Sequence, residues 1–121
     1  MDDLYFFDSY AVIELIKGNP KFDRFKSSNA ILTKLNLFEV DYFLRRVGTE
    51  AATEEEIFDK YSNHVVDFRL ETIRDATDLK INNKSLSMTD CIGYRVAQEY
   101  GIKFLTGDKE FEGMPGVEFV K

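Results

Sequence analysis

The segment from Ser87 to Phe111 constrains the fold of this 121-residue chain more than any other. Ser87 and Asp90 have the spacing of a capping box, which marks a helix start. The apolar side chains that follow near helical spacing are Met88, Ile92, Val96 and Tyr100. Gly101 stands where a glycine commonly ends a helix, and 103–106 predicts a short buried strand. A helix that leads directly into a buried strand is typical of α/β folds with a parallel sheet.

Strand and helix patterns alternate along the rest of the chain. Leu4 to Phe7 is a short apolar run that predicts a strand buried on both faces. Further strands are predicted at 30–33, 64–68 and 116–120, and helices at 10–16, 21–26, 35–47, 54–61 and 69–80. On the 35–47 helix, the apolar positions near helical spacing are Leu35, Phe38, Tyr42 and Leu44. This order predicts one domain, 1–121, built as a three-layer α/β/α sandwich around a mostly parallel sheet of about five strands.

The composition indicates a protein of a reducing compartment. Hydrophobic residues make up 44% of the chain, which is enough for a packed core. The single cysteine, Cys91, excludes an internal disulfide. No apolar run approaches the roughly 20 residues of a membrane span, and the acidic N-terminus MDDLYFF lacks the basic region of a signal peptide. The sequence therefore predicts a cytoplasmic protein without a membrane segment.

The charge is negative overall and unevenly distributed. A net charge of −6 argues against passive nucleic-acid binding, because such binding comes from neutralising phosphates. Between positions 17 and 46, however, there are seven basic residues and three acidic ones. Between positions 50 and 80 there are nine acidic residues and four basic ones. The basic part is compatible with a polyanionic substrate, and its candidate RNA contacts are Lys17, Arg24, Arg45 and Arg46. Ordinary solvated helix faces are the alternative interpretation.

Four carboxylates stand at chemically distinctive places. Asp8 ends the first predicted strand, Glu39 lies among apolar neighbours on a helix, Asp90 begins a helix and Asp108 follows a strand. In open α/β sheets, ligands bind beyond the carboxyl ends of the strands. A cluster of carboxylate oxygens at that edge is the donor set that Mg²⁺ or Mn²⁺ prefers. Taken singly, each acid also has a structural interpretation, as a helix cap, a turn residue or a partner in an ion pair.

The order of four segments, FFDS, LFEV, MTDCIGYRVAQEYG and FLTGDKEF, resembles the PIN domain family, especially its VapC-like toxin ribonucleases of toxin–antitoxin systems. The resemblance covers nearly the whole chain. It implies a metal-dependent endoribonuclease in which Asp8, Glu39, Asp90 and Asp108 bind Mg²⁺ or Mn²⁺. It also implies that Ser9 and Thr106 support this site. The partners implied by the resemblance are an RNA substrate, a second copy in a homodimer and a small antitoxin protein that blocks the site.

Other functions remain open at this point. A non-catalytic PIN-like module that binds RNA or protein is the main alternative. A phospho-acceptor receiver domain needs a lysine at the end of a late strand, where this chain has Asp108, and a haloacid-dehalogenase-like phosphatase needs an aspartate where it has Tyr10. The lone His64 and Cys91 are interpreted as structural. The aromatic residues Phe22, Phe25, Phe38, Tyr42 and Phe43 are predicted to lie mostly in the core, and any surplus is available to form a groove for an antitoxin helix.

Overall fold

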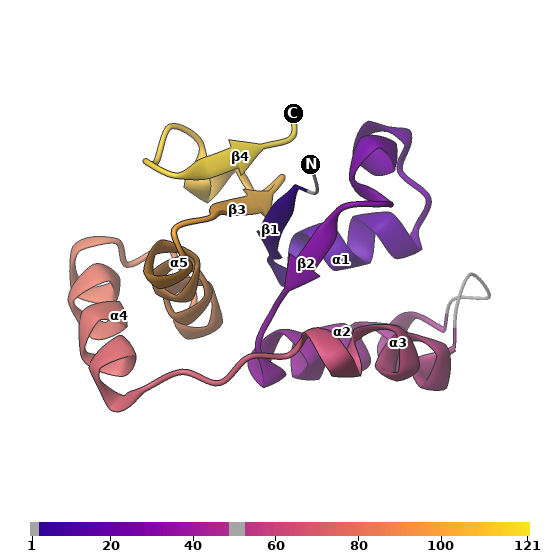
Figure 1. Ribbon diagram of the computed structural model, residues 1–121, viewed down its shortest axis with the longest axis horizontal. Helices are drawn as coiled ribbons and strands as arrows, with labels where there is room; N and C mark the ends of the chain where they lie inside the picture. Colours follow the sequence, from indigo (N-terminus) through magenta and orange to yellow (C-terminus); the bar gives the residue numbers. More distant parts are fainter. Residues whose placement is uncertain (1–2, 49–52) are drawn as a thin grey trace.

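A computed structural model describes residues 3–48 and 53–121 (Figure 1). The described strands form one parallel sheet in the order β2-β1-β3-β4, with β1 (Leu4–Phe7), β2 (Asn29–Ile31), β3 (Lys103–Thr106) and β4 (Val117–Phe119). The α-helices are α1 (Ser9–Ile16), α2 (Lys34–Val47), α3 (Glu54–Tyr61), α4 (Leu70–Asn82) and α5 (Met88–Tyr100). Short 3₁₀ helices are η1 (Pro20–Phe25), η2 (Ser62–His64) and η3 (Lys109–Phe111). Glu50, the first acid of the predicted acidic segment, lies outside the described residues.

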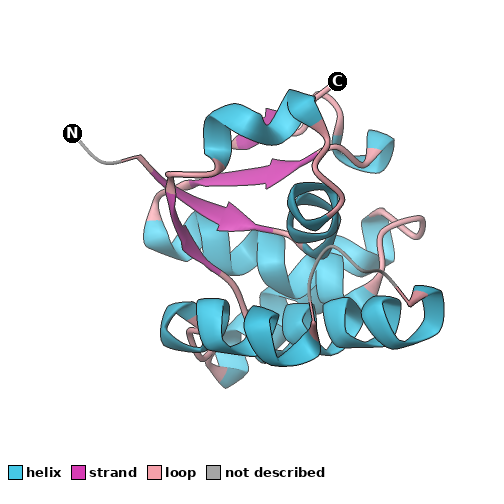
Figure 2. Ribbon diagram, turned by 90° about the vertical axis from the view of Figure 1, so that its right-hand side faces the viewer, coloured by secondary structure: helices cyan, strands magenta, loops and turns pink. Residues whose placement is uncertain are grey.

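Strand β1 lies inside the sheet, between β2 and β3, and its side chains divide the core in two. Successive side chains on a strand point to opposite faces. Phe6 therefore joins the apolar cluster built with α4 and α5, whereas Phe7 joins the cluster built with α1, η1, α2 and α3. Figures 1 and 2 show the strands side by side with helices on both faces of the sheet. The predicted three-layer α/β/α fold is thus confirmed.

Local sequence signals set the ends of several helices as predicted. The Ser87 and Asp90 side chains each accept a hydrogen bond from the other's backbone N–H, at 3.0 and 2.9 Å, which is the capping box expected at the start of α5. Gly101 ends α5 in the left-handed conformation, with φ of 66°. Thr53 caps α3 through a 3.2 Å hydrogen bond from the Glu56 N–H. These contacts fix where the helices begin and end.

The predicted strand at 64–68 is reduced to a single bridge between Leu32 and Val65. The Leu32 N–H donates to the His64 carbonyl at 3.2 Å, and the Val66 N–H donates to the Leu32 carbonyl at 2.9 Å. The pairing stops there because Thr33, predicted as strand, is the N-cap of α2 and turns the chain away. The described sheet therefore has four strands where the sequence predicted about five. Likewise, 21–26 was predicted as a helix and is the 3₁₀ turn η1.

The buried face of α2 differs from the predicted one. Leu37, Val40 and Leu44 are buried, whereas Phe38 and Tyr42 are 72% and 61% exposed. Both sets recur near helical spacing, so the pattern alone did not decide which set packs on the sheet. The prediction that the aromatic residues lie mostly in the core holds for Phe22 and Phe25, whereas Phe38 and Tyr42 form the surplus on the surface.

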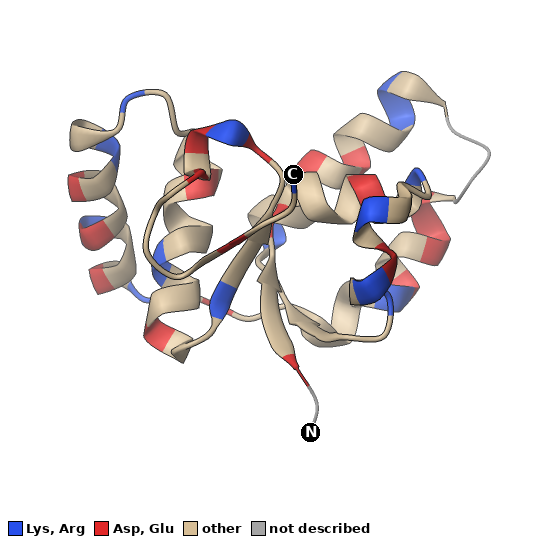
Figure 3. Cartoon of the chain, turned by 90° about the horizontal axis from the view of Figure 1, so that it is seen from above, with Lys and Arg blue, Asp and Glu red and all other residues tan. Residues whose placement is uncertain are grey.

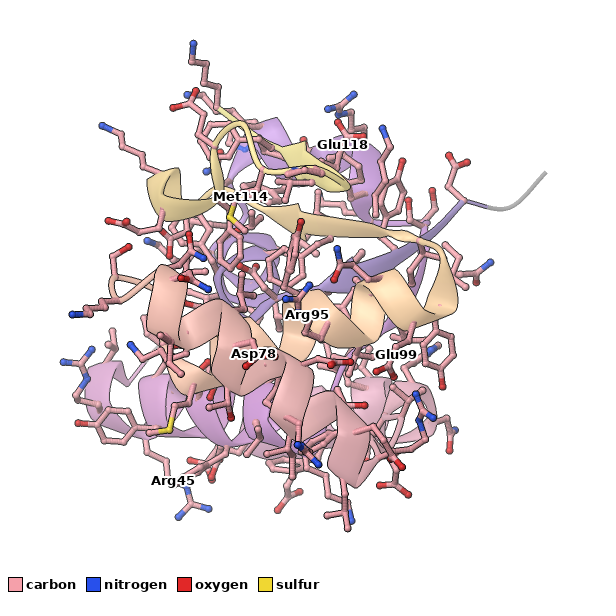
Figure 4. All side chains as sticks on the ribbon, turned by 90° about the vertical axis from the view of Figure 1, so that its left-hand side faces the viewer. Arg45, Asp78, Arg95, Glu99, Met114 and Glu118 are labelled. Carbon is pink, nitrogen blue, oxygen red and sulfur yellow. The ribbon has the colours of Figure 1, made fainter. Side chains whose placement is uncertain are left out.

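Helix α5 packs unusually close to the sheet through Gly93. A Cβ atom at this position would lie 2.8 Å from the Phe6 ring and 3.2 Å from the Phe104 ring. The two rings are stacked on each other with centroids 5.4 Å apart. Figure 4 shows α4 lying across α5 on the outside, with Arg95 and Glu99 of α5 beside it. Arg95 donates to the Asp75 carbonyl at 3.1 Å, and Glu99 accepts from Thr72 at 2.8 Å. This packing fixes the position of the helix that carries Asp90.

Among the described residues, no helix is both long enough and apolar enough to cross a membrane.

Candidate functional site

Asp8 occupies the junction between β1 and α1. Its side chain is the N-cap of α1 and accepts a 2.7 Å hydrogen bond from the Ala11 N–H, and the residue is only 3% exposed. Its own N–H donates to the Leu105 carbonyl at 3.3 Å, which ties the junction to β3. Burial raises the pKa of Asp8 to about 8, against the opposing effect of hydrogen bonds from Thr106 and Ala11. The negative charges of Asp90 and Asp108 raise it further.

Glu39 is held by a chain of hydrogen bonds that joins the first turn of α1 to that of α2. The Ser9 hydroxyl donates to Glu39 Oε1 at 2.5 Å, and Asn36 Nδ2 donates to Ser9 Oγ at 3.1 Å. Asn36 Oδ1 in turn accepts from the Thr33 backbone N–H at 3.0 Å and from the Thr33 hydroxyl at 2.8 Å. Burial raises the pKa of Glu39, a hydrogen bond from Ser9 lowers it, and the charge of Asp90 raises it. Residues of both α1 and α2 therefore help to orient the Glu39 carboxylate.

Asp90 sits in the first turn of α5, where the capping box with Ser87 fixes its carboxylate. Burial is the main cause that raises the pKa of Asp90, and the hydrogen bonds from Ser87 oppose it. The charge of Asp108 raises this pKa and that of Lys80 lowers it. The Lys80 ammonium donates to the carbonyls of Lys84 and Leu86 at 2.8 and 2.5 Å. Lys80 thus holds the loop that leads into α5.

Asp108 follows β3 and caps the short helix η3. Its side chain accepts from the Glu110 N–H at 3.0 Å, and its own N–H donates to Thr106 Oγ1 at 3.0 Å. Thr106 is fully buried at the end of β3. It contacts both Asp8 and the backbone of Asp108, so it links two of the predicted site residues.

The four predicted carboxylates share one neighbourhood at the carboxyl edge of the sheet. The charges of Asp90 and Asp108 raise the pKa of Asp8. The charge of Asp90 raises the pKa of Glu39, and the charge of Asp108 raises that of Asp90. Within 3–48 and 53–121, however, no three Asp, Glu, His or Cys side chains converge into a ready-made metal cage. The acids therefore influence one another's ionisation without forming such a cage.

The donor set fits a hard divalent cation. All four candidate ligands offer carboxylate oxygens, and Mg²⁺ is typically held by one or two carboxylates together with waters and substrate phosphates. The thiol and imidazole ligands that Zn²⁺ prefers, on Cys91 and His64, are not available at the four carboxylates. Cys91 is buried, with its thiol pKa raised by burial, and His64 belongs to η2, where its ring packs beside Tyr61. The neighbourhood therefore suits Mg²⁺ or Mn²⁺ better than Zn²⁺.

The four candidate RNA-contact residues are not gathered at the carboxylates. Lys17 lies at the far end of α1 from Asp8 and pairs with Glu14 at 3.2 Å. Arg24 pairs with Glu118 at 3.6 Å, while Arg45 pairs with Asp41 at 3.2 Å and with Glu54 at 3.3 Å. Arg46 lies over the Tyr42 ring at 5.4 Å. Figure 3 shows basic and acidic residues interspersed along these helices.

Comparison with known proteins identifies the family. The PIN domain family matches residues 5–117. The chain is a PIN domain. No curated protein sequence matches this PIN domain closely enough to mark a relative.

Two solved structures share its fold. A chain of a toxin–antitoxin complex from Klebsiella pneumoniae is 19% identical, with a TM-score of 0.80, over 97% of this chain and 98% of that one. The crystal structure of PAE2754 from Pyrobaculum aerophilum is 17% identical, with a TM-score of 0.70, over 99% of this chain and 92% of that one. At such identities, the likeness concerns the fold.

Two residues of this neighbourhood were missed in the sequence. Asn36 is a buried polar side chain, and its spacing from Thr33 in TKLN is that of a capping interaction, a signal that would have singled it out. Lys80 has no such signal, because its two carbonyl partners lie in the loop after α4 and become apparent only in the folded chain.

The raised pKa of Asp8 predicts that stability without metal falls as pH rises. The folded pKa of about 8 lies above the unfolded value of about 4, so the folded protein keeps a proton that the unfolded chain has lost between these two values. The stability from neutral Asp8 is therefore complete below about pH 4 and is lost as pH rises through about 8. Asp8→Asn, which still caps α1, should flatten the profile and raise the melting temperature at about pH 8.

Thermal melts in EDTA from about pH 5 to about pH 9 measure this effect. Asp23→Asn, a change at an exposed acid paired with Lys26, is the matched control and should follow the wild type. Parallel profiles for the wild type and Asp8→Asn would contradict a neutral Asp8 in the folded protein.

Proposed function

We propose that this PIN domain is a Mg²⁺- or Mn²⁺-dependent endoribonuclease, acting in the cytoplasm as the toxin of a toxin–antitoxin pair. One observation carries the proposal. Four buried or half-buried carboxylates from separate elements influence one another's charge, and burial raises the pKa of Asp8, Glu39 and Asp90. Such crowding of acids is unfavourable in the protein alone and is typical of functional sites.

The proposed roles follow from the contacts. Asp8, Glu39, Asp90 and Asp108 would hold the cation, which supplies an attacking water of lowered pKa and neutralises charge on the phosphodiester. Ser9 positions Glu39, and Ser87 positions Asp90, through the hydrogen bonds described above. Thr106 positions Asp8 and the backbone of Asp108. Hydrolysis adds water across one P–O bond, leaving a phosphate on one fragment and a hydroxyl on the other.

The complete set of acids favours an enzyme over a non-catalytic PIN-like binding module. A module that only binds RNA gains nothing from buried carboxylates, because these repel phosphate. A bound divalent cation would neutralise the carboxylates, remove that repulsion and allow the same residues to act in catalysis. The toxin role rests on the structural likeness to a chain of a toxin–antitoxin complex.

Cleavage of RNA should depend on the metal and on the acids together. With a labelled single-stranded RNA, we expect cleavage in Mg²⁺ or Mn²⁺, none in excess EDTA, and recovery when the metal is restored. Asp90→Asn should reduce the rate at least about a hundredfold while keeping the capping box and the fold. Fragment yield on a denaturing gel measures the rate.

The matched control for this experiment is Asp78→Asn, a change on the exposed face of α4. It should leave the rate unchanged. Cleavage that persists at full rate in EDTA, or in the Asp90→Asn protein, would exclude the proposed metal centre.

We also propose that Lys17, Arg24, Arg45 and Arg46 attract RNA at longer range. Exposed ion pairs are weak, so the partners of Arg45 do not cancel its effect on a polyanion. Replacing Arg45 and Arg46 by glutamate should weaken RNA binding and make its dependence on salt less steep, because fewer counterions are released. Fluorescence titrations at several salt concentrations measure both quantities. Unchanged affinity and slope would restrict these arginines to a structural role.

Exposed apolar side chains support the proposed protein partners. A groove of about 660 Å³ between α2 and α3 is lined by Phe38, Leu37, Phe58 and Val65, and it suits the apolar face of an antitoxin helix. Helix α4 exposes Leu70, Ile73 and Ile81, a surface that suits a second copy in a homodimer.

Phe38→Glu should therefore abolish co-purification with the proposed antitoxin, to be sought as a small protein encoded in a reading frame next to this one. The proposed dimer should persist by light scattering, because Phe38 lines the groove between α2 and α3 and is not part of the proposed α4 surface. A Phe38→Glu protein that still captures its partner, or that becomes monomeric, would contradict this division of surfaces.

A further inference from the structure

Another pocket is built from segments that adjoin Asp8 and Asp108 in the chain. It has a volume of about 210 Å³ and is enclosed by residues from α1, from η1 and the turn before it, from the segment after β3 and from the C-terminal end of the chain. Its walls combine aromatic rings with basic side chains: Tyr10, Phe22, Phe119, Lys21, Lys109 and Lys121. This combination differs from the pocket between α4 and α5, whose lining is mostly aliphatic and includes one lysine, Lys80.

The chain itself joins this pocket to the candidate metal site. Tyr10 is two residues after Asp8 and directly follows Ser9, which bonds to Glu39. Gly107 and Lys109 both line the pocket and flank Asp108 on either side. A ligand in the pocket therefore lies next to the two strand ends that carry Asp8 and Asp108.

Tyr10 is placed as an exposed stacking surface. Its ring packs so closely on Gly107 that a Cβ atom there would lie 2.6 Å from Tyr10 Cε1 and 3.1 Å from the Val120 carbonyl. The Phe22 ring supports it further in, with ring centroids 6.4 Å apart. Tyr10 nevertheless remains 42% exposed. The ring is thus fixed by its neighbours and still accessible from outside.

The lysines of the pocket are available for anions. Among the described residues, neither the Lys21 nor the Lys109 ammonium forms an ion pair, in contrast to those of Lys17 and Lys26. One acid, Glu112, lines the same pocket, so the lysines outnumber it. Ammonium groups that line the same pocket as an exposed ring suit a planar ligand with neighbouring negative charges.

We propose that this pocket binds one unpaired nucleobase of the RNA substrate, stacked on Tyr10, while Lys21 and Lys109 contact the neighbouring phosphates. The pocket is smaller than the roughly 300 Å³ of the smallest cavities for drug-sized ligands, which matches a single base. A base inside a duplex is stacked and paired and cannot enter. The pocket would therefore direct the enzyme to single-stranded or looped RNA. This inference rests on the proposed nuclease function and adds a substrate subsite to it.

Binding to inactive protein tests the subsite without interference from cleavage. In an Asp90→Asn background, the probe is a short fluorescent single-stranded RNA of mixed sequence, compared with the same RNA annealed to its complement. Tyr10→Ala should weaken single-strand binding about tenfold, the effect expected when one base loses its stacking partner. Tyr10→Phe should retain most of the affinity because it keeps the ring. Duplex binding should change little in either variant.

Lys109→Ala provides an independent measurement that does not disturb the packing of Tyr10. It should lower the slope of log affinity against log salt by roughly 0.7, the value for one phosphate contact on a single strand. The matched controls are Tyr100→Ala and Lys103→Ala. Tyr100 is an exposed tyrosine at the end of α5, and Lys103 is the first residue of β3, at the end of that strand away from Asp108. Both should bind as the parent protein does, and melting temperatures confirm folding.

The outcomes separate the subsite from the nuclease function. Tyr10→Ala binding as tightly as Tyr10→Phe, or losing single-strand and duplex binding equally, would overturn the subsite, and so would an unchanged salt slope in Lys109→Ala. If the protein with Asp90 intact still cleaves RNA in that case, the nuclease function stands alone. If the Tyr10 and Lys109 effects appear and no cleavage is found in Mg²⁺, the subsite stands and the nuclease function fails.

Discussion

The position of β1 inside a parallel sheet is the constraint on which the rest of this structure depends. Phe6 and Phe7 anchor the strand in the two halves of the core, and Asp8 follows at once as the cap of α1. Because β3 runs parallel to β1 in register, its end brings Thr106 and Asp108 to the same edge. Helix α5 brings Asp90 there because Gly93 lets it approach the Phe6 and Phe104 rings. Apolar packing thus determines where the polar groups meet.

The carboxylate neighbourhood works against the stability of the protein by itself. Burial alone would make a charged Asp8 costly, and the nearby acids add repulsion, so its pKa rises to about 8. Hydrogen bonds from Ala11, Thr106, Ser9 and Ser87 offset part of this cost for the different acids. Such stored repulsion is expected where a site is completed by a cation or substrate, since function and stability then make opposite demands.

The proposed nuclease must attract a polyanion despite a net charge of −6. Arg24 and Arg45 of the basic segment form ion pairs with acids of this chain. Their proposed contribution is therefore a long-range attraction of RNA and not a specific contact. The lysines of the aromatic pocket are differently placed. Lys109 directly follows Asp108 in the chain, and neither Lys21 nor Lys109 forms an ion pair among the described residues. A small number of well-placed cations is compatible with an acidic protein when a metal neutralises the site itself.

The sequence by itself determined the features that depend on near neighbours. The capping box of Ser87 and Asp90, the helix stop at Gly101 and the position of Asp8 at a strand end all follow from contacts within a few residues. The same local patterns predicted the α/β layering, and the resemblance to the family implied a common site for Asp8, Glu39, Asp90 and Asp108.

Only the tertiary structure decided which of several equivalent local patterns is used. Leu37, Val40 and Leu44 compete with Phe38 and Tyr42 for the sheet, and packing selects the first set. The predicted strand at 64–68 shrinks to a bridge because its partner turns into α2 after Leu32. Asn36 and Lys80 acquire their roles from partners on other segments, and the aromatic pocket joins Tyr10 to Lys121. The contacts of Asn36 with Ser9 and of Tyr10 with the C-terminal end join distant parts of the chain, and those of Lys80 depend on the path of a loop, so local periodicity could not predict them.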